Sequence, residues 1–254
     1  MAPDSGSNSG SGSGSARPSD LDAVADLLWR AAAAGAAGPE SGRPARLTPR
    51  RIIDTAVAVV DVEGLDALSM QRVAGELGCT AMALYRHVPG REQLVAAMVD
   101  TATGRPPAAS GAGWRAEVEA WVDALWSTYA RHPWMVRVAT VSAPVGPNEL
   151  AWFEALLSPL ARSGADRGEL IALATFISGA VRDLARLATE LDPDAAAAYG
   201  RVLAERLDPD RFPVLCSLFG ESGLDEEEEG DVTPIVACGI ARLLDGIEST
   251  RRTT

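Results

Sequence analysis

The sequence predicts an all-α protein, in which an N-terminal three-helix helix-turn-helix domain precedes a larger helical-bundle domain. Apolar residues recur at the three- and four-residue spacing of amphipathic helices along most of the 254 residues. The alternation of apolar and polar residues that is typical of strands is nowhere sustained. Residue types that favour helix starts and ends separate the apolar segments. Together these observations indicate packed helices without a sheet.

Residues 1–46 are predicted to be an N-terminal extension. The first 18 residues are mostly Ser, Gly, Asn and Pro, a composition that buries too little apolar surface to offset the entropy of ordering, so we expect disorder there. Apolar residues at helical spacing then predict a short helix over residues 20–34. Glycine and proline in residues 35–44 end it.

Residues 47–104 are predicted to be the helix-turn-helix domain, which we call the head. The first three predicted helices begin at a residue that favours helix starts and end at or before a glycine or proline. The starts and ends are Thr48 and Gly64, Ser69 and Gly78, Thr80 and Pro89, and, for a fourth helix, a start near Arg91. A short helix, a tight turn at Gly78 and a second short helix form a helix-turn-helix, whose second helix enters the major groove of DNA.

Residues 105–254 are predicted to be a second, helical domain, which we call the body. Residues 105–113, rich in Pro, Gly and Ala, connect it to the head. Seven helices are predicted, over residues 114–131, 134–141, 147–163, 167–191, 194–207, 212–219 and 232–248. The acidic run 225–229 is interpreted as a solvated loop.

The composition is that of a globular chain, since 47% of the residues are hydrophobic. No apolar run is long enough to span a membrane, and the first residues lack the features of a secretory signal. We therefore expect a cytoplasmic protein without a membrane partner. Cys79, Cys216 and Cys238 lack C-x-x-C spacing, and neither His87 nor His132 lies in a cluster of ligand types. We expect free thiols, no metal and no cofactor.

The net charge of −12 is unfavourable for binding nucleic acid, because such binding depends on neutralising phosphates. The distribution of charge changes this picture, since residues 43–91 carry seven arginines against five acidic residues. Arg43 and Arg46 precede the first head helix, where they could form a basic arm that enters a minor groove or could be solvated linker charges.

The residues of the head identify a family. Residues 68–94 read L-S-M-Q-R-V-A-G-E-L-G-C-T-A-M-A-L-Y-R-H-V-P-G-R-E-Q-L, and this stretch resembles the TetR family of bacterial one-component regulators. The specific part is L-Y-R-H-V with a following basic residue, placed after a capped A-x-x-L-G helix. The resemblance implies a repressor that binds a palindromic double-stranded DNA operator as a homodimer and is released by a small-molecule effector.

The body resembles the actinobacterial-like branch of that family with a longer C-terminal domain. The matching segments are R-H-P-W at residues 131–134, G-P-N-E-L-A-W-F-E at 146–154 and I-A-R-L-L-D-G-I at 240–247. By resemblance, the dimer interface is a four-helix bundle, which corresponds to residues 195–207 and 232–247 here. The apolar face expected in it comprises Ile235, Val236, Ile240, Leu243 and Leu244.

The resemblance also implies which residues contact DNA. Tyr85, His87 and Arg91 would bind phosphates, and their side chains suit that role. Gln71 and Arg86 are the side chains able to bind a purine edge in bidentate fashion. The full set of predicted contacts is Thr48, Arg50, Met70, Gln71, Thr80, Ala81, Met82, Ala83, Tyr85, Arg86, His87 and Arg91.

Several of these residues have a structural alternative. Tyr85 could pack between helices, and His87 could be a cap or a core residue. Met70 and Met82 could fill gaps in the core. Cys79, at a helix start, could be a redox-sensitive thiol, although its position corresponds to an apolar core site in the family.

The aromatic residues of the body predict an effector pocket. Five of the six tryptophans fall between residues 114 and 152. Such residues could line a site for a lipophilic or aromatic ligand, or they could be plain core. The predicted ligand contacts are Trp121, Trp126, Tyr129, His132, Trp134, Trp152, Phe153 and Phe176, with Asn148 and Arg182 as secondary candidates.

Two other functions were weighed against repression. An enzyme is not expected, because the sequence has no Gly-rich phosphate loop, no nucleophile elbow and no H-E-x-x-H motif. The second is a ligand- or partner-binding helical protein whose head no longer reads DNA, which the apolar start of the third head helix would allow.

Overall fold

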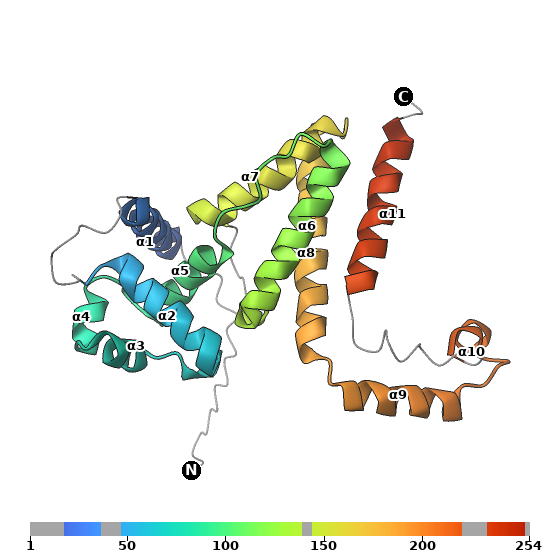
Figure 1. The fold of residues 1–254 in the computed structure, drawn as a ribbon, viewed down its shortest axis with the longest axis horizontal. Coiled ribbons are helices and arrows are strands. Elements are labelled where there is room, and N and C mark those ends of the chain that lie inside the picture. The colour runs from blue at the N-terminus through green and yellow to red at the C-terminus, as the bar shows by residue number, and fades with distance from the viewer. Residues whose placement is uncertain (1–17, 37–46, 139–143, 220–232, 252–254) are drawn as a thin grey trace, which may run out of the picture.

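The computed structural model describes residues 18–36, 47–138, 144–219 and 233–251. All regular structure in these ranges is helical, which confirms the predicted all-α class (Figure 1). The elements are α1 (Pro18–Ala36), α2 (Pro49–Glu63), η1 (Leu65–Ala67), α3 (Met70–Leu77), α4 (Ala81–Tyr85), α5 (Arg91–Thr103), α6 (Trp114–Arg131), η2 (Pro133–Arg137), α7 (Pro147–Arg162), α8 (Arg167–Glu190), α9 (Pro193–Arg206), α10 (Pro213–Phe219) and α11 (Thr233–Arg251). None of the described helices is long and apolar enough to cross a membrane.

The head is built from α1 to α5 around one apolar cluster, the head core. Its members are Leu27, Leu28, Ala31, Ile52, Ile53, Ala56, Val60, Leu68, Met70, Val73, Ala74, Leu84, Val88, Leu94, Ala97, Met98, Val99, Ala102, Trp134 and Met135. The helix predicted over residues 20–34 is therefore present as α1 and packs into the head (Figure 1). The rest of the predicted extension, including Arg43 and Arg46, lies outside the described residues.

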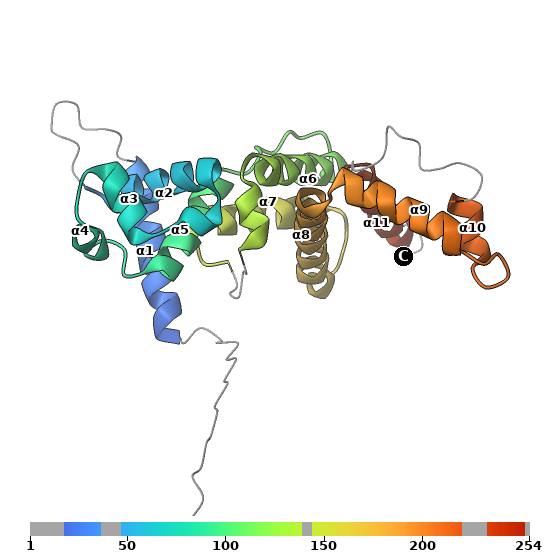
Figure 2. The ribbon, with the colours of Figure 1, turned by 90° about the horizontal axis from the view of Figure 1, so that it is seen from below.

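The body is built from α6, α7 and α8, which pack against one another, and from α11, which packs on α8. Its apolar cluster, the body core, comprises Val118, Trp121, Val122, Leu125, Trp152, Leu156, Leu160, Ala174, Ile177, Val181, Val236, Ile240 and Leu244. Helices α9 and α10 extend away from this bundle as an arm (Figures 1 and 2). The predicted acidic loop 225–229 lies outside the described residues.

Two body predictions are corrected by the structure. In the described part of the helix predicted over residues 134–141, the chain forms the 3₁₀ segment η2, in which Trp134, Met135 and Val136 are all buried, and Val138 after it has an extended backbone. Residues 139–141 lie outside the described residues. The apolar face of residues 232–247 was predicted to lie in the dimer interface. Val236, Ile240 and Leu244 are instead buried in the body core of the same chain, because α11 packs on α8, whereas Ile235 is 55% exposed.

Candidate functional site

The turn between α3 and α4 is defined by its glycine. The Ser69 hydroxyl starts α3 by accepting a hydrogen bond of 3.0 Å from the Arg72 amide. The helix ends at Gly78, whose backbone is left-handed (φ 67°, ψ 33°), a conformation that favours glycine. The next amide, Cys79 N, donates back to the Ala74 carbonyl at 3.0 Å. The chain is thereby turned so that α4 follows α3 after three residues, as predicted for a helix-turn-helix.

Helix α4 presents three neighbouring side chains to solvent. Leu84 is fully buried in the head core and anchors the helix. Met82 is 71% exposed and Tyr85 is 46% exposed. Arg86 follows them and is exposed, and its side chain forms no hydrogen bond or ion pair with the described part of the chain. We call Met82, Tyr85 and Arg86 the α4 surface.

The other predicted DNA contacts differ in how exposed they are. Gln71 and Thr80 are exposed, whereas Ala81, Ala83 and His87 are half-buried. The Thr48 hydroxyl caps α2, and both Arg50 Nε contacts, at 2.7 and 2.8 Å, are with the Asp54 carboxylate. These placements keep Gln71 and Thr80 accessible and give Thr48 and Arg50 local structural partners.

Met70 does not belong to an exposed surface. Its side chain is 6% exposed and lies in the head core, so the core alternative holds for Met70 and the predicted DNA contact is corrected. Helix α3 begins at Met70, and its inward face carries Met70, Val73 and Ala74 at helical spacing. Met82, by contrast, points outward. Cys79 is half-buried against the head core, which agrees with its expected apolar position.

Arg91 has a structural role that its predicted phosphate contact did not include. Its Nε donates to the Leu68 carbonyl at 3.3 Å, and its Nη2 lies 3.5 Å from the Leu65 carbonyl. These bonds tie the start of α5 to the loop before α3. Arg91 as a whole residue remains exposed.

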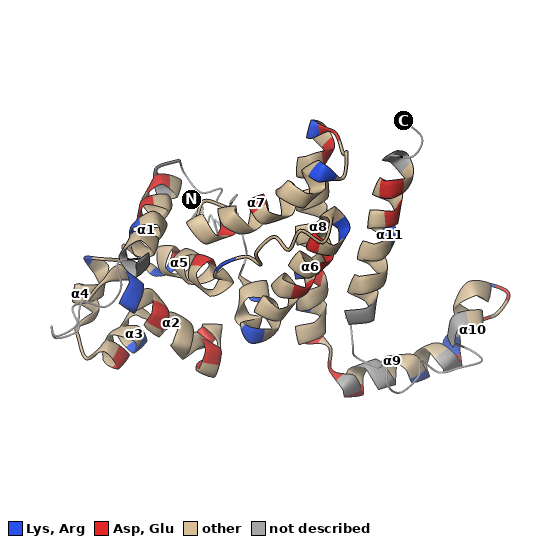
Figure 3. Cartoon of the chain, turned by 45° about the horizontal axis from the view of Figure 1, so that its top comes forward, with Lys and Arg blue, Asp and Glu red and all other residues tan. Residues whose placement is uncertain are grey.

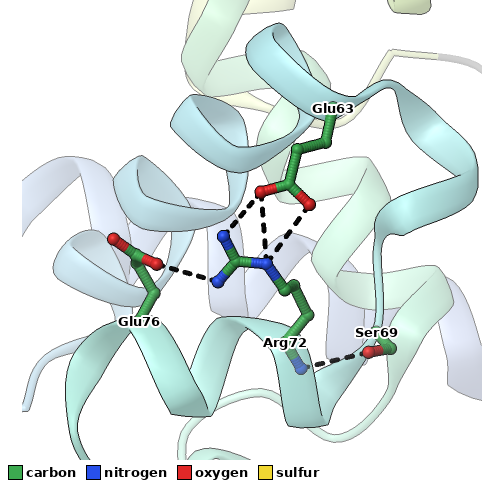
Figure 4. A network of polar contacts seen from close by, with 4 residues as sticks. All are labelled: Glu63, Ser69, Arg72 and Glu76. Carbon is green, nitrogen blue, oxygen red and sulfur yellow. Dashed lines mark hydrogen bonds and ion pairs between the residues drawn. The ribbon is translucent and has the colours of Figure 1, made fainter.

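Arg72 holds α3 against the end of α2, a role that sequence reasoning missed. Its guanidinium lies between the carboxylates of Glu63, at 2.5 Å, and Glu76, at 2.8 Å (Figure 4). The bond from Arg72 lowers the pKa of Glu63. Because both pairs are partly exposed, each adds little stability. Figure 3 accordingly shows acidic and basic segments close together on α2 and α3.

In the body, Trp121 and Trp152 form a buried pair. Their ring centroids lie 5.6 Å apart at an interplanar angle of 69°. The indole N–H of Trp121 donates to the Trp152 carbonyl at 2.9 Å, and that of Trp152 donates to the Gly104 carbonyl at 3.1 Å. Trp152 therefore connects α7 to the residue that ends α5.

Three predicted ligand contacts lie away from this pair. The indole N–H of Trp134 donates to the Asp61 carboxylate at 2.6 Å, and His132 Nδ1 lies 2.7 Å from the same oxygen. Both residues thus join the body to the end of α2, and Trp134 belongs to the head core. Phe176 is 62% exposed on α8. The prediction that these three line one pocket with Trp121 is therefore wrong for the single chain.

Three further predicted ligand contacts are half-buried against the body core: Trp126, Tyr129 and Phe153. This degree of burial is expected both for residues that line a pocket and for residues of a plain core. Burial raises the pKa of the Tyr129 phenol to about 12, an effect opposed by Arg182 and reinforced by Glu149. A phenol, a carboxyl and a guanidinium from α6, α7 and α8 thus interact electrostatically inside the bundle. Such converging polar groups beside aromatic rings are typical of small-molecule sites.

Asp100 joins the head to the body, and sequence reasoning did not single it out. Its side chain, 3% exposed, accepts hydrogen bonds from the amides of Asn148 at 2.9 Å and Glu149 at 3.0 Å. The Asn148 side chain also donates to the Asp100 carboxylate and carbonyl, at 3.1 and 2.9 Å. Asp100 therefore caps the start of α7 from α5. An aspartate in the otherwise apolar segment A-A-M-V-D-T-A was the available signal.

The geometry of this junction also constrains Gly146. A Cβ added to Gly146 would lie 2.1 Å from Asp100 Oδ1, so only glycine leaves room for the carboxylate. A further hydrogen bond links α1 to the same segment: the Trp29 indole N–H donates to the Val145 carbonyl at 3.1 Å. We call Asp100, Gly146, Asn148 and Glu149 the α5–α7 joint.

The fold and the α4 surface define a class of protein: a DNA-binding regulator with a helix-turn-helix head and a helical sensing body. Residues 52–98 match the family described as "Bacterial regulatory proteins, tetR family", and residues 106–251 match "Tetracyclin repressor-like, C-terminal domain". The chain belongs to the TetR family and is a ligand-responsive transcriptional regulator of that family, as the resemblance implied.

Similar proteins come from actinobacteria. The chain is 32% identical over 242 residues to the HTH-type transcriptional repressor DrrR1 of Streptomyces coeruleorubidus, covering 90% of this chain and 86% of DrrR1. It is 32% identical over 137 residues to an HTH-type transcriptional regulator of Saccharopolyspora erythraea, covering 53% and 58% of the two chains. Apo ActR from Streptomyces coelicolor has a similar structure, with a TM-score of 0.71, 26% identity and coverage of 82% and 97%. ActR in complex with actinorhodin gives a TM-score of 0.69, 26% identity and coverage of 80% and 96%.

Proposed function

We propose that this regulator represses transcription by binding a palindromic operator as a homodimer, with the α4 surface in the major groove, and that an apolar effector bound in the body releases it. The observation that carries the proposal is the α4 surface itself. Its three side chains project from a helix that Leu84 anchors in the core. Because repression requires DNA, the site of action is the bacterial cytoplasm, and the function is regulation without catalysis.

The three side chains of the α4 surface suit different kinds of contact with DNA. The Arg86 side chain has no partner among the described residues, so its guanidinium is available for the bidentate bond that recognises guanine. Met82 offers an apolar contact for a thymine methyl group. The Tyr85 hydroxyl is placed to donate to a phosphate, a contact that sets register and carries no sequence information.

The body supports an effector with a large apolar surface. The aromatic residues proposed to contact it are Trp121, Trp126, Tyr129, Trp152 and Phe153, all buried or half-buried in the bundle. ActR, a protein of similar structure, was solved in complex with actinorhodin, so the fold accommodates an organic ligand. We propose that the effector acts on the head through α7, which is bonded to α5 by Asp100 and to Gly104 by Trp152.

Exposed apolar residues on the body support dimer formation. Ile171 is 61% exposed and Phe176 is 62% exposed on α8, and Ile235 is 55% exposed on α11. Single exposed apolar residues are ordinary, but several on neighbouring helices favour an interface. We propose that this surface of α8 and α11 meets its copy across a twofold axis, since paired heads must match a palindrome.

The test is selection of an operator from random duplex DNA by the purified chain, followed by measurement of its affinity at fixed salt. Arg86→Ala should weaken binding about 10-fold or more and relax the preference at one base pair, because a bidentate contact contributes about 1–3 kcal/mol. Tyr85→Phe should weaken binding to all sequences equally, because it removes a phosphate contact.

Arg167→Ala is the matched control, because Arg167 is an exposed arginine at the start of α8, far along the chain from α4. It removes the same charge and should leave affinity within twofold. Failure to enrich any sequence, or equal losses in Arg86→Ala and Arg167→Ala, would refute the proposed role of the α4 surface.

A further inference from the structure

Helix α1 contacts both the head and the body. Leu27, Leu28 and Ala31 are buried in the head core. Trp29 faces another direction, because a helix turns by about 100° per residue. It is 54% exposed, and its indole N–H donates to the Val145 carbonyl, 116 positions later, at 3.1 Å. Burial in the head core accounts for the first three residues but not for the contact of Trp29 with the body.

The partner of Trp29 belongs to the segment that seats the body on the head. Val145 packs against the head core, the next residue is the buried Gly146, and α7 follows directly. Asp100 of α5 holds the same helix start by accepting hydrogen bonds from two amides of α7. The start of α7 is therefore held by two helices of the head, α5 and α1.

A third attachment lies elsewhere on the head. The Asp61 carboxylate, near the end of α2, accepts the indole N–H of Trp134 at 2.6 Å. In Figure 1, α1 lies at the upper side of the head beside the start of α7, whereas the end of α2 lies at the lower side beside the end of α6. The attachments at Asp61 and Asp100 alone would leave the head free to rotate about the line between them. The bond from Trp29 reaches the body from a different helix and opposes that rotation.

We propose that Trp29 is a positioning residue for operator binding, which braces the head against the start of α7 and so fixes the spacing at which the dimer presents its two heads. One base pair added between half-sites displaces a half-site by about 3.4 Å along the duplex and by about 34° around it. A braced head follows that displacement only by breaking the bond from Trp29. Helix α1, which precedes the residues 52–98 that match the family, thus contributes to specificity for operator spacing.

This inference rests on the proposed function, because spacing matters only when paired heads bind one palindrome. The test uses the operator selected by the wild-type chain and two versions with one base pair added or removed between its half-sites. The quantity measured is the ratio of the Kd for a changed spacing to the Kd for the selected spacing. Trp29→Phe keeps an aromatic ring and removes the donor, so this ratio should fall by about 2- to 10-fold, the range for one hydrogen bond.

A general loss of stability would weaken binding at all spacings alike and would leave the ratio unchanged. Trp114→Phe is the matched control, because Trp114 is half-buried on α6 and its indole N–H has no hydrogen-bond partner among the described residues. It should keep the wild-type ratio, and circular dichroism should show both variants folded. An unchanged ratio in Trp29→Phe, or an equal fall in both variants, would overturn the proposal.

Hydrogen exchange tests the brace without DNA. The amides of residues 148–150, in the first turn of α7, should exchange about 2- to 10-fold faster in Trp29→Phe, because the head then separates from this turn more often. Exchange in Trp114→Phe should match the wild type. Wild-type exchange in Trp29→Phe would refute the brace. A chain that selects no operator would refute the proposed function, whereas the exchange rates would still decide whether Trp29 holds the start of α7.

Discussion

At the α5–α7 joint, the neighbouring carboxyl groups of Asp100 and Glu149 lie in environments that disfavour their charged forms. Burial raises the pKa of Asp100, although the hydrogen bonds from Glu149 and Asn148 partly compensate. Burial and the nearby Asp100 carboxylate raise the pKa of Glu149 from 4.5 to about 7, while a backbone bond from Gly146 opposes the rise. Because Asp100 caps a helix with its negative charge, the proton is expected mainly on Glu149.

We predict that Glu149→Gln makes the protein more stable at pH 8 and flattens its pH dependence. The pKa of Glu149 is raised above its unfolded value, so the folded state binds more protons between pH 4.5 and about 7. Stability is therefore fully present below that window and is lost as the pH rises through it. Glutamine removes the loss of stability, which corresponds to about 3 kcal/mol at pH 8 for a pKa raised from 4.5 to about 7.

Urea unfolding at fixed protein concentration from pH 5 to pH 8 measures this effect. Glu154→Gln, on the exposed side of the same helix, is the control and should keep the wild-type slope. If the free energy of unfolding of Glu149→Gln changed with pH as steeply as that of the wild type, Glu149 would be shown to stay charged in the folded protein.

Among the elements, α7 has the widest set of connections between head and body. Its start is capped by Asp100 of α5, the segment before it accepts a hydrogen bond from Trp29 of α1, and Trp152 in its second turn reaches Gly104. The first turn of α7 also carries Glu149, which raises the pKa of Tyr129 of α6, while Arg182 of α8 lowers that pKa. A shift of α7 caused by an effector must therefore disturb α5, and with it the head.

We predict that Gly146→Ala destabilises the chain by about 1–3 kcal/mol, the typical cost of inserting a methyl group where no space exists. The φ of Gly146 is −78°, which any residue adopts, so the effect arises from the contact with Asp100 and not from the backbone. The midpoint of urea unfolding, followed by circular dichroism, measures it.

Gly75→Ala is the control, because an added Cβ at that helical position meets no atom within 4 Å. It should stabilise the chain by up to about 1 kcal/mol, because alanine is the better helix former. If the two substitutions shift the midpoint in the same direction, the carboxylate of Asp100 is not held against Gly146.

For the molecule as a whole, the head and the body have separate cores that meet at α5, α7 and η2. Trp134 and Met135 of η2 belong to the head core although they follow α6 of the body. The apolar residues left exposed are on α8 to α11 for the most part, whereas the head exposes Trp29, Val62, Met82 and Tyr85. This asymmetry favours self-association through the body, which leaves both heads free.

We predict that Ile171→Asp combined with Phe176→Asp converts the protein from a dimer to a monomer, because two charges would be buried at the proposed interface. Sedimentation velocity measures the change, and affinity for the operator should fall with it. Val62→Asp introduces a charge at a residue that is 85% exposed on the head and should leave the dimer intact. A dimer that survives the double substitution would exclude this surface of α8.

The local chemistry of the sequence was sufficient to predict most helices and the helix-turn-helix. Thr48, Ser69 and Gly78 act where they were expected, because a cap or a left-handed turn depends on residues within four positions. The placement of the α4 surface followed from the same spacing together with the family resemblance.

Burial was decided by contacts between distant parts of the chain, which a local pattern does not contain. Met70 turned inward, α11 buried Val236 against its own subunit, and Trp134 packed with the head and not with Trp121. The α5–α7 joint depends on Asp100 meeting residues 46 to 49 positions later. Periodicity predicts that a side chain has an apolar neighbour, and only the packed fold determines which one.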